Sequence, residues 1–449
     1  MASHPVRLVV SDDLRRSRLT VFFRLLLALP HFVWLLLWSF LMVFVAIAAW
    51  VVGLVLGRLP RGLHGFIAAY IRYGTHLFSY LVLAANPYPS FTGEPGYPVD
   101  VELPEPERQA RWKIAIRLLL ALPAFLLAAA LGFGGGGGGG GSSYDESGES
   151  TGAYASTGFL GVAGACAVLG WFAALALGRM PLGLRNLASY AVGYGAQTYA
   201  YVLLLTDRYP NSNPDESGAA WDLPPHPVRL ALDDDGRRSR LTVFFRLLLA
   251  IPHLVWLLLW SIAAFFAALA NGIVALIRGR SAAPLHRFLT AYVRYSAHVT
   301  AFLFLVANPF PGFTGTPGYP VDVDLGEAER QKRWVTFFRI ILGLPALIVS
   351  AALSAALFVA AFLGWFAALV TGKMPTGLRN LGAACVRYLA QTGAYWSVLT
   401  DRYPHASPAL RPPPEPEPEP ELEPEPEYEP EPERAPEGEP YRRPDPDAS

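Results

Sequence analysis

Three long apolar stretches limit what this chain can fold into. The first runs from Leu19 to Gly57, 39 residues with a single charge at Arg24, and comparable stretches occupy 241–277 and 334–372. As one helix, such a stretch would measure about 58 Å, roughly twice the ~30 Å hydrocarbon thickness of a bilayer. Charged residues make up only 16% of the chain, against ~25% in ordinary soluble domains. These features predict an all-α integral membrane protein.

The sequence contains four tandem copies of one unit. Residues 17–39 recur almost unchanged at 239–261, an offset of 222, and each half contains a weaker repeat at an offset of 93. The second unit carries 28 additional residues, which include the glycine run Gly134–Gly141. We divide the chain into unit 1 (1–96), unit 2 (97–225, with a Gly-rich insertion at about 133–158), unit 3 (226–318), unit 4 (319–405) and a Glu/Pro-rich tail (406–449).

The insertion leads to a topology prediction. Its polar backbone and its carboxylates, such as Asp145, cannot be satisfied in lipid, so it splits the apolar stretch of unit 2 into two pieces of about one membrane thickness. We therefore expect a transmembrane helical hairpin in each unit, eight spans in total. Arg117 and Arg179 flank a stretch without Lys or Arg, so the positive-inside rule places the N-terminus and the tail in the cytoplasm. The alternative is an interfacial helix at 19–29 and one span at 31–57, with the direction reversed in every unit.

Each hairpin is followed by a third helical segment, Gly62–Ala85 in unit 1. Arg72, Thr75, His76 and Ser79 form a polar stripe along it at helical spacing. A cation and an imidazole on one stripe favour an amphipathic helix that lies in the cytoplasmic headgroup layer. A third span in each unit, with the stripe buried between helices, is the alternative.

Short extended arms separate the units. Val99–Leu103 alternates apolar and polar residues with period two, as a half-buried strand does. Arg7 and Arg229 lie in the odd arms, and Asp100 and Asp322 lie in the even arms. We expect the four cytoplasmic arms to pair into a small sheet that joins odd units to even units, with these opposite charges facing each other.

Two sets of arginines are the candidate contact residues for lipids or anions. They are Arg24, Arg117, Arg246 and Arg339 at the start of each apolar stretch, and Arg72, Arg294 and Arg387 in the third segments. Long arginine side chains at helix ends commonly extend to headgroup phosphates, so anionic phospholipid is the expected partner. A ring of four arginines around a pseudo-fourfold centre, serving an anion pathway, is the alternative.

Several motifs together resemble a known family. They are FFRLLLALPH at Phe22–His31, GR-x-P-x-GL at Arg179–Leu184 and TDRYP at Thr206–Pro210, and the first and last recur in the second half. The combination is similar to an actinobacterial membrane family catalogued as domain of unknown function 4389. That resemblance implies a membrane location and no assigned activity. Unit 3 departs from the pattern at Gly279–Pro284, which replaces GR-x-P-x-G.

The same sequence argues against several functional classes. The apolar spans contain no Asp or Glu, the glycine run is not followed by a phosphate-binding lysine, and neither HExxH nor GxSxG occurs. We expect a non-enzymatic multi-pass protein of the plasma membrane, without cofactor, metal or nucleic acid, that acts as a scaffold. Residues 411–449 carry 14 acidic and 4 basic residues, a net charge of −10, so a basic protein partner for this tail is a further hypothesis.

Overall fold

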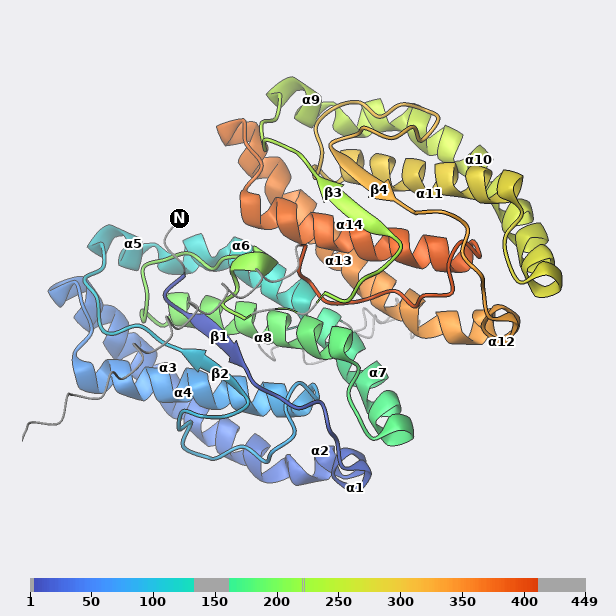
Figure 1. Ribbon diagram of the computed structural model, residues 1–449. Helices are drawn as coiled ribbons and strands as arrows, with labels where there is room; N and C mark the ends of the chain where they lie inside the picture. The colour runs from blue at the N-terminus through green and yellow to red at the C-terminus, as the bar shows by residue number, and fades with distance from the viewer. Residues whose placement is uncertain (1–3, 133–160, 220, 222, 411–449) are drawn as a thin grey trace, which may run out of the picture. The chain divides into compact units, whose positions relative to one another are not determined.

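The computed structural model describes residues 4–132, 161–219, 221 and 223–410. The described chain is mostly helical, and each of its four units has an extended arm, a short helix, a long helical stretch and a second helix of 21 residues (Figure 1). The predicted insertion at 133–158 and the tail beyond residue 410 lie outside the described residues.

The units contain the following elements. Unit 1 holds β1 (Arg7–Val10), α1 (Arg18–Phe22), α2 (Arg24–Leu27), α3 (Leu29–Leu56) and α4 (Arg61–Leu81). Unit 2 holds β2 (Val99–Glu102), α5 (Arg111–Ala115), α6 (Arg117–Leu131), α7 (Val162–Leu177), α8 (Leu182–Val202) and the 3-10 helix η1 (Pro214–Glu216). Unit 3 holds β3 (Arg229–Leu232), α9 (Arg240–Phe244), α10 (Arg246–Arg278) and α11 (Ala283–Leu303). Unit 4 holds β4 (Val321–Asp324), α12 (Arg333–Phe337), α13 (Arg339–Thr371) and α14 (Thr376–Trp396).

The long helices end at glycines because the chain needs a left-handed residue to turn there. Gly57, Gly178, Gly279 and Gly372 follow α3, α7, α10 and α13 with φ between 68° and 71°. The next helix then starts within a few residues. Unit 3 keeps this turn at Gly279 although its following sequence departs from the family pattern.

The predicted helical hairpins are wrong. The stretch Arg24–Leu56, and likewise Arg246–Arg278 and Arg339–Thr371, is helical over 33 residues without a reversal, and each is long and apolar enough to cross a membrane. The physical reason is that these stretches contain no residues that would turn the chain back. Pro30 lies in the first turn of α3, where a missing N–H matters least, and α10 and α13 continue past Pro252 and Pro345, which lie inside them. The structure therefore has one long helix per unit, as in the alternative topology.

The insertion misled the hairpin prediction because the helices on either side of it do not fold back on each other. The helix before it, α6, and the helix after it, α7, pack against the same partners, α8 and α13. Their facing ends adjoin, since a Cβ atom on Gly161 would lie 2.5 Å from the Cα atom of Gly132. Together α6 and α7 correspond to the single helix of the other units.

The arms pair between odd and even units, as predicted, but they form two separate sheets among the described residues. β1 runs antiparallel to β2, and β3 runs antiparallel to β4. The charge pairing differs from the prediction: Arg7 faces Glu102, and Arg229 faces Asp324, while Val9 faces Asp100. Asp100 instead lies 2.8 Å from Nε2 of His76 in helix α4.

The second helices form the middle of the structure. In the first half α4 packs against α8, α3 packs against α4, and α6 and α7 pack against α8. The sheet covers the same helix pair, with β2 on α4 and β1 on α8. The second half repeats this plan with α11 and α14 (Figure 1). The polar stripe of α4 faces the sheet, because Arg72 and His76 contact Asp100, so it is not an exposed stripe. The predicted location of these helices in the headgroup layer stays a prediction.

The even units join the two halves of the described chain. Helix α13 packs against both α6 and α7. The buried residues of α6 and α13 are rich in alanine, including Ala124, Ala128, Ala356 and Ala360. Small side chains allow helix axes to approach closely. The resulting apolar core is continuous across both halves.

Candidate functional site

Every unit begins its long helix with a buried arginine. We call the four equivalent residues the unit-start arginines: Arg24, Arg117, Arg246 and Arg339. Their side chains are at most 4% exposed. In unit 2, Nη1 of Arg117 donates to the carbonyl oxygens of Tyr201 at 2.7 Å and Thr206 at 2.8 Å, and Nη2 donates to the Asp207 carboxylate at 2.9 Å.

The other three unit-start arginines make equivalent hydrogen bonds. Arg24 donates to the carbonyl oxygens of Tyr80 and Ala85, Arg246 to those of Phe302 and Ala307, and Arg339 to those of Tyr395 and Thr400. Each guanidinium carbon also lies 4.2–4.6 Å from the centre of an aromatic ring, which adds a cation–π contact.

These arginines act as caps for the second helix of their unit. The chain leaves each second helix through a left-handed residue, namely Leu83, Leu204, Leu305 or Val398, with φ between 58° and 64°. The last carbonyl groups of a helix have no partner within it, and a cation is favourable at this end of the helix dipole. Contact of the unit-start arginines with lipid or anions stays a prediction, and their burial argues against it.

The second arginine set divides into two kinds. In unit 1, Nε of Arg72 lies 3.5 Å from Oδ1 of Asp100, and Nε2 of His76 lies 2.8 Å from the same oxygen. Unit 3 repeats this cluster with Arg294, His298 and Asp322 at 3.4 and 3.0 Å. In unit 4, by contrast, Arg387 is buried and donates to the carbonyl oxygens of Ser407 and Ala409. The lipid contact predicted for these residues is likewise untested.

Burial and hydrogen bonding oppose each other at the two aspartates. Burial raises the pKa of Asp100, but the bonds from His76 and from the amides of Gly96 and Val101 outweigh it, so the pKa is lowered. The pKa of Asp322 is lowered in the same way. Burial also lowers the pKa of His298 although Asp322 partly opposes this. The clusters therefore hold a carboxylate that stays ionised between helix and sheet.

Sequence reasoning missed a second buried ion pair in the odd units. Arg16 and Asp12 lie 2.7 Å apart, and Arg16 also donates to the carbonyl oxygen of Leu83. Arg238 and Asp234 repeat the pair at 2.8 Å. The even units have Gln109 and Gln331 instead, which donate to the carbonyl oxygens of Leu204 and Val398. The recurring Asp-x-x-x-Arg spacing was the available signal.

The odd long helices expose a large apolar surface. In the most apolar 18-residue part of Arg24–Leu56 and of Arg246–Arg278, only 17% of the residues are buried, against 50% in Arg339–Thr371. Leu36 and Phe40, for example, are 71% and 69% exposed. The large apolar residues exposed in the middle of α10 are Leu258, Leu259, Ile262, Phe265, Phe266 and Leu269.

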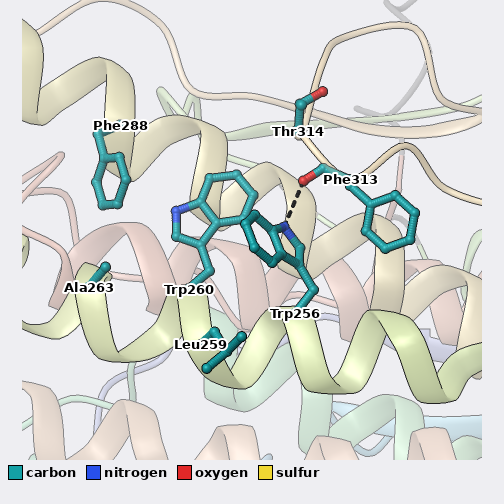
Figure 2. Close-up of a pocket in the computed structure, with 7 residues that line it drawn as sticks. All are labelled: Trp256, Leu259, Trp260, Ala263, Phe288, Phe313 and Thr314. Atoms are coloured by element: carbon teal, nitrogen blue, oxygen red, sulfur yellow. Dashed lines mark hydrogen bonds between the residues drawn. The ribbon is translucent and has the colours of Figure 1, made fainter.

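An apolar groove of about 540 Å³ opens on this surface in unit 3. Figure 2 shows Trp256, Leu259, Trp260 and Ala263 on α10, with Phe288 from α11 and Phe313 and Thr314 from the following loop. Nε1 of Trp256 donates to the carbonyl oxygen of Phe313 at 2.9 Å (Figure 2). In unit 1 the tryptophans and phenylalanines recur, but Leu41 stands at the position of Ala263.

Each odd unit also has a buried histidine near its tryptophans, and sequence reasoning did not identify these two residues. Nδ1 of His31 is 2.9 Å from the Tyr73 hydroxyl, and Nδ1 of His253 is 2.8 Å from the Tyr295 hydroxyl. The available signal in the sequence was the Leu/Ile-Pro-His motif, which occurs in both odd units. In unit 2, Ala124 stands at the position of the histidine. Across the described ranges, no group of three His, Cys, Asp or Glu residues is placed to hold a metal ion.

Comparison with protein families gives four matches, one in each unit. The family described as Domain of unknown function (DUF4389) matches residues 18–93, 156–212, 240–314 and 333–407. Comparison with curated proteins and with solved structures gives no significant match. The matched segments cover more than half of the sequence, and they include Arg24, Arg246 and Arg339 and the exposed apolar helices α3 and α10, while Arg117 lies before the segment matched in unit 2. The chain therefore belongs to the DUF4389 family, of which it carries four tandem copies.

Proposed function

We propose that this protein is a non-enzymatic membrane scaffold that contacts lipid through the exposed apolar sides of α3 and α10. The observation that carries the proposal is the difference in burial between equivalent helices: 17% for the odd units and 50% for α13. Soluble monomers rarely expose contiguous apolar patches larger than a few hundred Å². Lipid acyl chains would remove this surface from water, at about 25 cal/mol for each Å².

The polar clusters support a structural role rather than catalysis. The unit-start arginines are bonded to carbonyl groups, and the carboxylates of Asp12, Asp100 and Asp207 are paired with cations. The groove beside Trp256 is lined by apolar side chains and one threonine. We propose that the plasma membrane is the location and that the acidic tail recruits a basic envelope partner. Among the described residues, the contacts between units two and four form an alanine-rich packed core, which does not support an anion pathway there.

Flotation with lipid vesicles tests the membrane contact. Purified protein is mixed with vesicles of phosphatidylcholine and phosphatidylglycerol and centrifuged through a density gradient. We expect the wild type to float, and we expect Leu36→Ser combined with Phe40→Ser to lower the floating fraction several-fold. Val9→Ser, on the exposed side of β1, is the control and should float like the wild type. A wild type that stays monodisperse without detergent and does not float would overturn the proposal.

The scaffold role has its own measurement. Cross-linking in membranes, followed by purification of the full chain or of a chain ending at residue 410, should recover a membrane partner that depends on the tail. Recovery of the same proteins with both chains would contradict a partner for the tail while leaving lipid contact intact.

A further inference from the structure

The orientation of the long helices relative to the membrane follows from where the sheets lie. In unit 1, α3 and α4 run alongside each other. His31 and Ser39 of α3 bond to Tyr73 and Tyr70, and Arg24, just before α3, bonds to Tyr80, so the pair is antiparallel along the second half of α4. Whatever angle α3 makes with the bilayer, α4 makes nearly the same angle.

The β1–β2 sheet lies beside the middle of α4, not at an end. Asp100 of β2 bonds to Arg72 and His76, which are central residues of the helix Arg61–Leu81. The sheet therefore lies beside the middle of α4 and beside the first half of the stretch Arg24–Leu56, inside the length of both helices. Its outward side chains include Arg7 and Glu102, both exposed. The second half has the same arrangement, with Arg229 and Asp324 exposed beside the middle of α11.

A bilayer crossed by α3 would have this sheet at the depth of its hydrocarbon core. An exposed arginine at that depth costs at least about 2.5–3.5 kcal/mol. The edges of a two-stranded sheet would also present backbone N–H and C=O groups to acyl chains, which lipid-exposed structures avoid. A spanning orientation is thus incompatible with the exposed charges of both sheets.

The basic residues at the helix ends point to the same conclusion. Arg16 N donates to Gly178 O, and Gln109 N donates to Gly57 O, so the start of each long stretch meets the end of its neighbour. Exposed basic residues gather at both meeting points: Arg15, Arg18 and Arg179 at one, and Arg58, Arg61, Arg108 and Arg111 at the other. The second half repeats them with Arg237, Arg240 and Lys373 at one point and Arg278, Arg280, Arg330, Lys332 and Arg333 at the other.

We propose that α3 and α10 lie parallel to the membrane plane within one leaflet, with both sheets in water and the basic residues of both helix ends in a single anionic headgroup layer. This inference rests on the proposed lipid contact and specifies its geometry. Each basic residue near an anionic surface contributes about 1 kcal/mol to binding. In this orientation all four basic clusters contribute on one side, whereas spanning helices would place half of them on each side.

Depth measurements along α3 test the orientation. Cys166 and Cys385 are replaced by alanine, and single cysteines are placed at Leu26, Phe40 and Val55, which are all exposed. A nitroxide is attached to each, and its depth in phosphatidylcholine/phosphatidylglycerol vesicles is measured from collisions with oxygen and with a water-soluble nickel complex. We expect similar depths at the three positions, within roughly 5–10 Å of the headgroup boundary. A deep label at Phe40 between two shallow labels would overturn the proposal.

A labelling experiment separates this inference from the proposed function. Single cysteines at Arg58, Arg179 and Glu102 are treated with a membrane-impermeant maleimide in intact cells and in inverted membrane vesicles. We expect all three to react in the same preparation only. Flotation of the protein together with reaction of Arg58→Cys and Arg179→Cys from opposite sides would contradict the in-plane orientation but keep lipid contact. Absence of flotation would contradict both.

Discussion

Odd and even long helices share one frame but differ in what covers them. Both kinds start with a capping arginine and end at a left-handed glycine, and both pack on a second helix. At equivalent positions, however, Trp34 and Trp38 of α3 correspond to Leu127 and Leu131 of α6, and the latter are buried. The repeat therefore fixes the backbone through a few polar contacts, while the remaining apolar side chains decide whether a helix faces another helix or the exterior.

The cap is the part that the two classes share, so removing it should have the largest effect. We expect Arg117→Met to destabilise the protein by about 2–3 kcal/mol, because two buried carbonyl groups would lose their partner while Asp207 keeps its ion pair with Lys113. Chemical unfolding in detergent would measure this. Arg18→Met, at an exposed arginine, is the control. A loss below about 1 kcal/mol at Arg117 would show that the cap does not hold the frame together.

The covered and uncovered helices can be compared at one equivalent position. Ala356 of α13 is fully buried, whereas its counterpart Ala263 of α10 lies in the open groove. We expect Ala356→Leu to cost about 1–3 kcal/mol through overpacking. Ala263→Leu, which places in unit 3 the residue type that Leu41 has in unit 1, should leave unfolding unchanged and should fill the groove. Equal effects in thermal unfolding would remove the distinction between the two helix classes.

The arms of the odd units should be more sensitive to acid than those of the even units. His226 Nδ1 accepts from the Val228 amide, and burial lowers its pKa to about 4. The folded state thus favours the neutral ring, so stability is full above pH 6.5 and declines as the pH falls from 6.5 toward 4. We expect His226→Asn, which keeps the acceptor, to reduce this decline. Melting temperatures between pH 7 and pH 4 would measure it, and an unchanged pH profile would contradict the assignment.

The smallest expected effect concerns the register of the sheets. Because Arg7 faces Glu102, Arg7→Glu should cost about 0.2–1 kcal/mol, and adding Glu102→Arg should restore most of the loss. The matched pair in the second half is Arg229 with Asp324. A double-mutant cycle measures the coupling, and a double variant no better than the single one would place the interaction of Arg7 elsewhere.

Much of this plan was accessible from the sequence, and the errors have physical causes. The offset of 93 located the capping arginines and the pairing of odd with even arms. It could not show the partners of the arginines, because a backbone carbonyl has no sequence signature and lies 56 residues away from Arg24 in the chain. Hydropathy shows that a stretch is apolar, but it does not show whether another helix covers it. The sequences of α3 and α13 therefore gave no sign that one is exposed and the other half buried. The polar insertion, treated as a turn, produced the incorrect hairpins.

The adjoining ends of α6 and α7 have a practical consequence. Since Gly132 and Gly161 lie in contact, the two helix ends meet whether or not residues stand between them. Unit 4 performs the same packing without them. We expect a chain that lacks 133–160 to fold, and this position to accept a fluorescent protein or an affinity tag as a genetically encoded reporter of the intact protein.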